Sequence, residues 1–289
     1  MSEFPRPKRK TDTLSKSEDT VKRTKRETAQ EYVASAREIQ QAARDSHFPQ
    51  VLSDALKKEI KDFLWSVEPR IVKFGRFKID LTSRPQRAWG IPNPDGDLPL
   101  YVYGQAKESY AEVEHMPAVL YEAAQFLEQR FAHPPGYLNL AFATFYGNGS
   151  EHHIPPHQDK AVAKESEGRV EATAPIYNLS FGAARSFVFA GLGILPLWGA
   201  KKGGKEMDYG PYTVKKILME CGDLVVLTPF LNENTAHMIP KEDAMGMRIS
   251  LVFRHCTKRY LSKDKRSYYT MVYNKKTREW QRGASHALA

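Results

Sequence analysis

Apolar residues recur at helical spacing in two segments of the N-terminal half. In residues 51–66 and 116–132 they return every three or four positions, which is the spacing of one helix face. These positions are Val51, Leu52, Leu56, Ile60 and Leu64 in the first segment and Val119, Leu120, Ala123, Phe126 and Leu127 in the second. Residues 27–46 also contain strong helix formers, but their apolar stripe is thin, which predicts an exposed or peripheral helix.

After Pro69 the pattern changes to short strands and loops. Residues 71–77 predict a strand that turns at Gly75, residues 83–99 a polar, proline-rich loop, and residues 100–103 a short strand. Six further strands are predicted where apolar runs are separated by Gly, Pro, Asn or Asp, at residues 138–146, 176–181, 185–189, 215–219, 224–228 and 247–254. Many short strands behind a helical preface predict an α+β fold with a β-sandwich or jelly-roll core.

The composition is that of a soluble globular protein with charged ends. Apolar residues make up 41% and charged residues 27% of the 289 residues, and no apolar run is long enough to predict a membrane span. Only two cysteines occur, Cys221 and Cys256, so a disulfide framework is not expected and a reducing compartment is favoured.

Positive charge is concentrated at both ends of the chain. Residues 1–26 hold nine Lys and Arg against four Asp and Glu, and residues 254–289 hold ten against two, so the part between is acidic. Basic ends of this kind favour a polyanionic partner. The alternative is that they are tails that only keep the protein soluble. Residues 1–26 are expected to be disordered, and the basic clusters at 8–10 and 22–26 resemble a bipartite nuclear-localisation signal. We therefore expect a nuclear protein, with a cytoplasmic pool as the alternative. The aromatic and basic residues of 258–289 suit nucleic acid or a closing strand equally.

Residues 152–161, HHIPPHQDKA, contain a candidate metal site. His157 and Asp159 are two positions apart, so in an extended chain both side chains project to one face. Non-haem Fe(II) oxygenases bind iron with two histidines and one carboxylate. His237 is the candidate second histidine because it follows an apolar strand, whereas His152 and His153 precede two prolines and are interpreted as exposed. Alone, a His-x-Asp triplet is more often a solvated pair in a loop.

The run RISLVFR, residues 248–254, alternates without a break. One face is apolar, formed by Ile249, Leu251 and Phe253, and the other face holds Arg248, Ser250, Val252 and Arg254. Two arginines on the inner face of a barrel strand are costly unless an anion pairs with each. A short dicarboxylate would satisfy both guanidinium groups. The alternative is an edge strand with this face in solvent.

Together, His157, Asp159, His237, Arg248 and Arg254 resemble the site residues of Fe(II)- and 2-oxoglutarate-dependent dioxygenases. More narrowly, they resemble those of the AlkB family of nucleic-acid dealkylases. The resemblance covers about residues 50–256 and implies a double-stranded β-helix (jelly-roll) core with supporting N-terminal helices and a nucleotide-recognition lid. It also implies that the three candidate ligands hold Fe(II), with 2-oxoglutarate and O2 as co-substrates.

The AlkB signature runs Asn-x-Tyr, His-x-Asp, His and Arg-x-Asn-x-x-x-Arg. Tyr146 matches the tyrosine, whereas Thr144 and Ser250 replace the two asparagines and keep a hydrogen-bonding side chain. The resemblance therefore implies that 2-oxoglutarate is bound by Tyr146, Arg248, Arg254, Ser250 and Thr144.

Within the family, the chain most resembles the duplex-DNA repair branch. Residues 174–189 are similar to a strand pair of that branch, and KFGRF, residues 73–77, to its hairpin, with Phe74 as the wedge in the base stack. Residues 83–90 and 100–104 look like parts of the lid, which spans about residues 70–104. The implied substrate contacts are Arg84 at the backbone, Tyr101 at the flipped base and Tyr103 stacked on that base opposite His157, with Trp89 also binding substrate. A wedge and a lid serve base extrusion.

These features predict oxidative dealkylation of N-methylated nucleobases by a monomer without membrane association, with DNA favoured over RNA. The repair branch reads the base with an acidic residue two positions after the aspartate, where this chain has Ala161. The alternatives are an RNA N-methyladenine demethylase, a protein hydroxylase and a non-catalytic nucleic-acid-binding module. The expected organisation is a basic tail (1–26), N-terminal helices (27–66), the dioxygenase domain (67–257) and a C-terminal extension (258–289).

Overall fold

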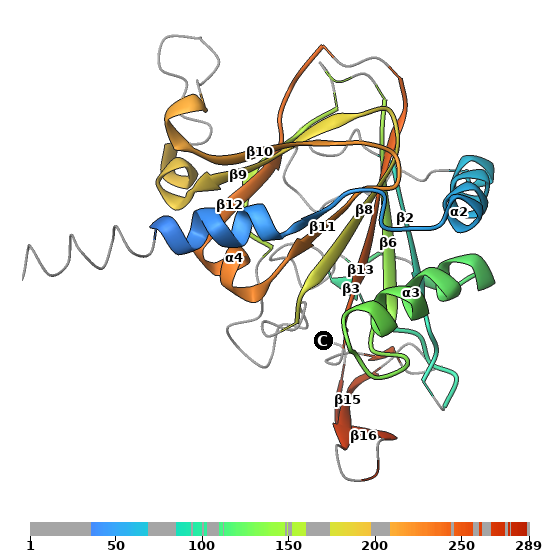
Figure 1. The fold of residues 1–289 in the computed structure, drawn as a ribbon. Coiled ribbons are helices and arrows are strands. Elements are labelled where there is room, and N and C mark those ends of the chain that lie inside the picture. Colours follow the sequence, from blue (N-terminus) through green and yellow to red (C-terminus); the bar gives the residue numbers. More distant parts are fainter. Residues whose placement is uncertain are drawn as a thin grey trace, which may run out of the picture.

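Two β-sheets form the centre of the protein in a computed structural model (Figure 1). The structure describes residues 36–68, 85–93, 95–99, 101–102, 110–111, 113–147, 149, 152–159, 174–197, 209–243, 246–256, 260–261, 267–274, 277 and 279–287. In the larger sheet the strand order is β1 (His47–Phe48), β11 (Leu224–Leu227), β8 (Ile176–Gly182), β13 (Arg248–Arg254), β6 (Leu140–Tyr146), β2 (Gln86–Gly90) and β5 (Val113–His115). In the smaller sheet it is β10 (Thr213–Met219), β9 (Arg185–Gly191), β12 (Thr235–Ile239) and β7 (Ile154–His157).

The remaining strands in the described part of the chain form two smaller sheets. β3 (Tyr101–Val102) pairs with β4 (Tyr110–Ala111), and β14 (Tyr260–Leu261), β15 (Ser267–Asn274) and β16 (Glu279–Ala287) form a three-stranded sheet. The described strands of the C-terminal extension therefore form a sheet of their own and do not close either of the two central sheets.

Two helices cover the outer face of the larger sheet. They are α2 (Asp54–Ser66), which begins at Ser53 with a side-chain cap on the Leu56 amide, and α3 (Ala118–Arg130). Their apolar faces pack on the outward residues of the sheet in one core, which includes Leu56, Ile60, Leu64, Leu120 and Leu127 together with Ile249, Leu251 and Phe253. Both helices lie inside the segments predicted from the apolar spacing, so that prediction is confirmed.

A second apolar core lies between the two sheets. It combines residues from the larger sheet, such as Phe142 and Val252, with Phe187 and Phe189 of β9 in the smaller sheet. The paired sheets with a filled interior confirm the predicted jelly-roll core, and all six strands predicted beyond α3 are present to within two residues at each end. Short helices flank the strands of the smaller sheet. α4 (Pro229–Asn234) links β11 to β12, the 3₁₀ turn η2 (Leu192–Leu197) follows β9, and the 3₁₀ turn η3 (Gly210–Tyr212) precedes β10.

The predicted loop at residues 83–99 is wrong over part of its length. β2 lies there, antiparallel to β6 and parallel to β5, because the six residues between Pro85 and Pro92 are enough for a five-residue strand that pairs on both sides. The prolines that suggested a loop lie just outside the strand, where their missing amide hydrogen costs no ladder bond.

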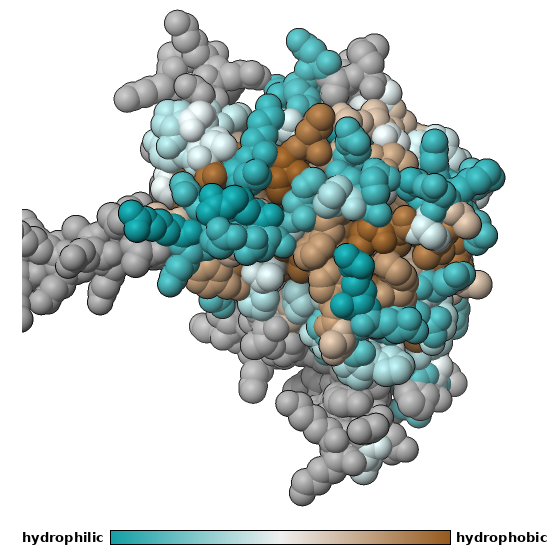
Figure 2. Space-filling view, viewed as in Figure 1, coloured by the Kyte–Doolittle hydropathy of each residue, from teal (hydrophilic) through white to brown (hydrophobic). Residues whose placement is uncertain are grey.

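The helix predicted at residues 27–46 is described over 36–45, and most of its residues there are exposed, as predicted. Ala43 is fully buried and joins the core between the sheets, since a stripe of small residues lets the helix approach closely. Figure 2 shows that this helix presents hydrophilic residues outward, while hydrophobic residues gather between it and the two outer helices. None of the described helices is long and apolar enough to cross a membrane.

Several predictions concern residues outside the described part of the chain. These are the disordered tail 1–26, the strand at 71–77 and most of the lid, including Phe74, Arg84 and Tyr103. Tyr101 lies in β3, but its side chain is also outside what the structure describes.

Candidate metal and co-substrate site

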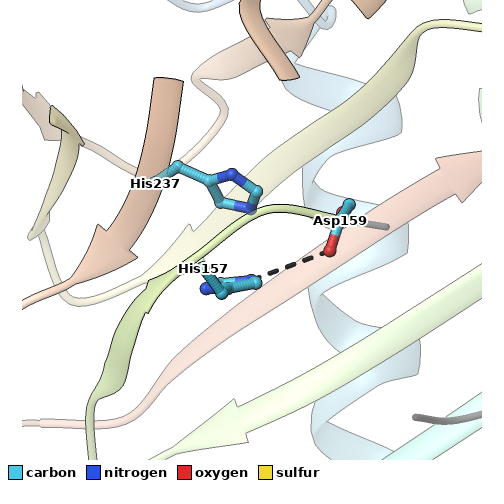
Figure 3. A group of neighbouring side chains, drawn as sticks. All are labelled: His157, Asp159 and His237. Atoms are coloured by element: carbon cyan, nitrogen blue, oxygen red, sulfur yellow. Dashed lines mark ion pairs between the residues drawn. The ribbon is translucent and has the colours of Figure 1, made fainter. Parts of the chain in front are cut away.

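His157, Asp159 and His237 lie together, with one ligand atom from each within 4.8 Å of the others (Figure 3). The two histidines are directly opposite each other on the paired strands β7 and β12, and their ring centroids are 4.2 Å apart. Nε2 of His157 is 3.7 Å from Oδ1 of Asp159. The predicted ligands thus converge, although Asp159 lies just beyond β7 and not in the strand itself.

Hydrogen bonds fix the orientation of His157 and the position of Asp159. Nδ1 of His157 lies 2.8 Å from the carbonyl of Pro155, which leaves Nε2 for a metal. Asn232 of α4 accepts a hydrogen bond from the Asp159 amide and donates one to the Asp159 carbonyl. Because α4 leads directly into β12, this six-residue helix positions both Asp159 and His237.

The charges at the site suit a divalent metal. Burial raises the pKa of Asp159, but Arg254 and the two histidines lower it more, to about 2. Burial, with a further contribution from His157, lowers the pKa of His237 to about 3. At neutral pH the site therefore offers a carboxylate and a neutral imidazole, which are the forms that bind metal. Nδ1 of His237 is buried without a hydrogen-bond partner among the described residues, and the other ring nitrogen faces Asp159 (Figure 3).

Arg248 is fully buried on the inner face of β13. Its Nε donates to Oγ of Ser180 at 3.0 Å, whereas Nη1 and Nη2 have no hydrogen-bond partner in the described part of the chain. β13 lies between β6 and β8 in the middle of the larger sheet, so the alternative of an edge strand in solvent is wrong. A buried cation with two unpartnered nitrogens requires an anion.

Arg254 has a partner that the sequence did not reveal. Its Nη2 donates to Oδ2 of Asp159 at 2.8 Å, and only 8% of the residue is exposed. The two arginines predicted to share one dicarboxylate therefore differ, since Arg254 already binds the metal-site carboxylate.

A sequence model of the 2OG-Fe(II) oxygenase superfamily matches residues 46–254, which is most of the chain and spans both sheets and the site. This chain belongs to the 2OG-Fe(II) oxygenase superfamily. A search of curated proteins found no significant match. Among solved structures, one titled "The structure of OsALKBH1" matches with a TM-score of 0.41 and 15% sequence identity, covering 72% of this chain and 95% of that one.

The residues present in this oxygenase fit the Fe(II), 2-oxoglutarate and O2 that its superfamily uses. His157, Asp159 and His237 are the two-histidine, one-carboxylate set of non-haem Fe(II) oxygenases. Nη1 and Nη2 of Arg248, which have no hydrogen-bond partner among the described residues, fit a carboxylate of 2-oxoglutarate.

The other predicted co-substrate residues form part of a polar row across the interior of the oxygenase. Thr144 and Ser250 are paired neighbours on β6 and β13, and Tyr146 is paired with Arg248 one step along. Two further residues of this row carry no signal in the sequence. Asn178 of β8 accepts a hydrogen bond at Oδ1 from the Ser250 hydroxyl at 2.6 Å. Gln86 of β2 is paired with Thr144, and its Oε1 is buried without a partner among the described residues.

The prediction that Trp89 binds substrate is wrong. Its side chain is on the outer side of β2, where it is 2% exposed and packs against Phe63 of α2 with ring centroids 5.6 Å apart. Inner and outer positions alternate along a strand, so the neighbouring Ala88 faces the interior instead.

His152, interpreted as exposed, is half-buried. Its Nδ1 accepts a hydrogen bond from the Gly147 amide at 2.6 Å, and its carbonyl accepts one from Arg185. The proline pair that suggested an exposed loop lies in β7, at the edge of its sheet, where prolines are tolerated.

Proposed function

We propose that this oxygenase removes N-methyl groups from nucleobases in nucleic acid, with DNA favoured over RNA. The metal-site cluster beside the buried Arg248 carries the oxidative part of the proposal. The AlkB-type order of the signature residues and the basic ends of the chain support the nucleobase part. The basic clusters in residues 1–26 support a nuclear location, which stays a prediction.

The proposed reaction consumes one O2 and one 2-oxoglutarate for each methyl group. Bound Fe(II) supplies oxidation of the N-methyl carbon, with 2-oxoglutarate converted to succinate and CO2. The hydroxylated methyl group leaves as formaldehyde and the nitrogen regains a proton, so that one oxygen atom ends in succinate and the other in formaldehyde.

The described residues of the chain bind, orient and shield the reactants. His157, Asp159 and His237 would hold the metal, Arg254 keeps Asp159 ionised, and Arg248 would hold a carboxylate of the co-substrate. On the buried side of the site, the ring of Phe187 stacks on His237 with centroids 5.7 Å apart, and together with Phe189 it forms an apolar wall beside the metal-site residues.

The test is mass spectrometry of a panel of methylated oligonucleotides after incubation with the full chain, Fe(II), 2-oxoglutarate and O2. The panel contains 1-methyladenine and 3-methylcytosine in duplex DNA, and N6-methyladenine in single-stranded RNA. We expect loss of one methyl mass and release of formaldehyde from DNA, and neither with His237→Ala.

Other outcomes distinguish the alternatives. Turnover on RNA alone would make the protein an RNA demethylase. Conversion of 2-oxoglutarate to succinate without demethylation of any oligonucleotide would contradict the nucleobase proposal and favour protein hydroxylation. Nucleic-acid binding without any succinate would indicate a non-catalytic module.

A further inference from the structure

We infer that Arg185 is a second cationic contact for the far carboxylate of 2-oxoglutarate, and that it helps to select a dicarboxylate. Arg185 begins β9 and lies on the same side of that strand as Phe187 and Phe189, which belong to the core between the sheets. It is fully buried. A buried arginine in this position has to be explained by what its guanidinium contacts.

One part of this guanidinium has protein partners. Nε donates to Oε1 of Glu242 at 2.9 Å, and Nη2 donates to the His152 carbonyl at 2.9 Å, with longer contacts to the carbonyls of Gly149 and Pro240. Nη1 is buried and has no hydrogen-bond partner in the described part of the chain. Leaving a charged donor buried and unpaired is unfavourable, because the group loses its hydration without gaining a hydrogen bond.

Arg248, on the opposite sheet, also has buried guanidinium nitrogens without a hydrogen-bond partner among the described residues. Cζ of Arg185 is 6.0 Å and Cζ of Arg248 is 5.1 Å from the ring centroid of Tyr146. Burial lowers the pKa of Arg248, and the nearby Arg185 contributes to that lowering. Among the described residues, one guanidinium nitrogen of Arg185 and two of Arg248 thus lack a partner, and both cations lie around the ring of Tyr146.

The charges near these groups do not balance. Glu242 pairs with Arg185 and is partly exposed, whereas no carboxylate among the described residues forms an ion pair with Arg248. Within the described part of the chain one positive charge is therefore left, and an anion with several acceptor oxygens would satisfy the remaining donors. The superfamily's co-substrate brings such a group, since 2-oxoglutarate has a carboxylate at the end opposite its 2-oxo acid.

A purely structural role for Arg185 makes a different prediction. Its bonds join the segment before β7 to the segment after β12, and these two strands carry His157 and His237. If Arg185 only held these two segments together, removing the charge of Arg185 and removing the charge of Glu242 would weaken ligand binding at the site equally. If Arg185 also attracts the co-substrate, the two changes have opposite effects on binding of a dicarboxylate.

The experiment is isothermal titration calorimetry of the full chain loaded with Mn(II), with two ligands. One ligand is 2-oxoglutarate, and the other is 2-oxobutyrate, which has the same 2-oxo acid but no second carboxylate. For Arg185→Gln we expect 2-oxoglutarate to bind about 10-fold more weakly or worse, as for loss of a charged hydrogen bond, and 2-oxobutyrate to bind within about 2-fold of wild type. For Glu242→Gln we expect 2-oxoglutarate to bind as tightly as in wild type or more tightly.

Two results would overturn the inference. If both variants bind both ligands more weakly and to the same extent, Arg185 only holds the two segments together. If Arg185→Gln binds 2-oxoglutarate as tightly as wild type, Arg185 does not contact the co-substrate. If Arg185→Gln does not fold, Arg185→Lys replaces it, with weaker binding of 2-oxoglutarate alone as the supporting result and equal weakening of both ligands as the contrary one. The inference depends on the superfamily's co-substrate, and no nucleic acid is present in the assay, so failure of the dealkylation proposal is tested separately.

Discussion

Nη2 of Arg254 donates a hydrogen bond to Oδ2 of Asp159, 95 residues earlier in the chain, at 2.8 Å. This bond joins the end of β13, in the larger sheet, to the ligand that follows β7, in the smaller sheet. Asp159 presents its other oxygen, Oδ1, toward His157. Arg254 thereby holds the carboxylate in an ionised form and a fixed orientation, which is the role of groups that support a metal ligand.

Replacing Arg254 with glutamine should weaken metal binding without unfolding the protein. The pKa of Asp159 should rise because burial then acts with less opposition from a nearby cation. Loss of such a supporting group lowers metal affinity by about 10- to 100-fold. Titration with Mn(II) or Co(II), followed by calorimetry, measures this, with Arg37→Gln at an exposed position as control. Equal affinity in wild type and Arg254→Gln would contradict the role.

Ser250 and Asn178 should behave as a coupled pair. Their hydrogen bond is 2.6 Å long and joins β13 to β8 in the interior. Each of Ser250→Ala and Asn178→Ala removes that bond, so the double variant should lose less stability than the sum of the two single losses, by about 0.5–1.5 kcal/mol. Urea unfolding of the four proteins gives the coupling, and strict additivity would show that the bond contributes nothing.

Trp89 should be important for stability and not for substrate binding. Replacing this buried ring with alanine should lower the free energy of unfolding by about 3–5 kcal/mol, as for other large aromatic side chains in cores. Trp89→Phe, which keeps an aromatic contact with Phe63, should lose less. If Trp89→Phe remained fully stable yet bound methylated DNA much more weakly, the substrate role predicted from the sequence would be restored.

His133 should make the protein less stable in mild acid. Its ring stacks on Tyr137 and its Nε2 lies 2.6 Å from the hydroxyl of Tyr177, and burial lowers the pKa of His133 below its usual 6.5. As the pH falls through 6.5, the unfolded chain therefore binds a proton before the folded chain does. The contribution of neutral His133 to the stability of the fold is complete above pH 6.5, and it is lost as the pH falls from there toward the pKa of His133 in the folded state.

The measurement for His133 is the melting temperature between about pH 7.5 and about pH 5, a range in which histidines titrate. The decrease should be smaller in His133→Phe, which keeps the stacked ring but does not titrate. His115→Phe, at an exposed histidine, is the matched control. An identical decrease in wild type and His133→Phe would exclude this contribution.

Periodic elements and short motifs of this fold could be predicted because their information is local. The alternation of residues 248–254 placed Arg248, Ser250 and Arg254 on one face, and the His-x-Asp triplet gave two of the three converging ligands. β2 was missed because six residues framed by prolines have the composition of a loop. The burial of Trp89 depends on which side of β2 the outer helices cover, which the sequence of that segment does not encode.

Contacts between distant segments could not be predicted. Asn232, Asn178 and Arg185 are ordinary polar residues in the sequence, and their roles arise only when the two sheets and α4 come together. Nothing local in the sequence indicates that Arg254 pairs with Asp159, which follows a strand of the other sheet.

The central claim is that His157, Asp159 and His237 bind one divalent ion together. The most direct test is Co(II) titration of the full chain, followed by the visible absorption of the bound ion and by calorimetry. The account predicts one ion per chain, and loss of that binding in each of His157→Ala, Asp159→Ala and His237→Ala while the far-UV circular dichroism is unchanged. Unchanged Co(II) binding in any one of these folded variants would contradict it.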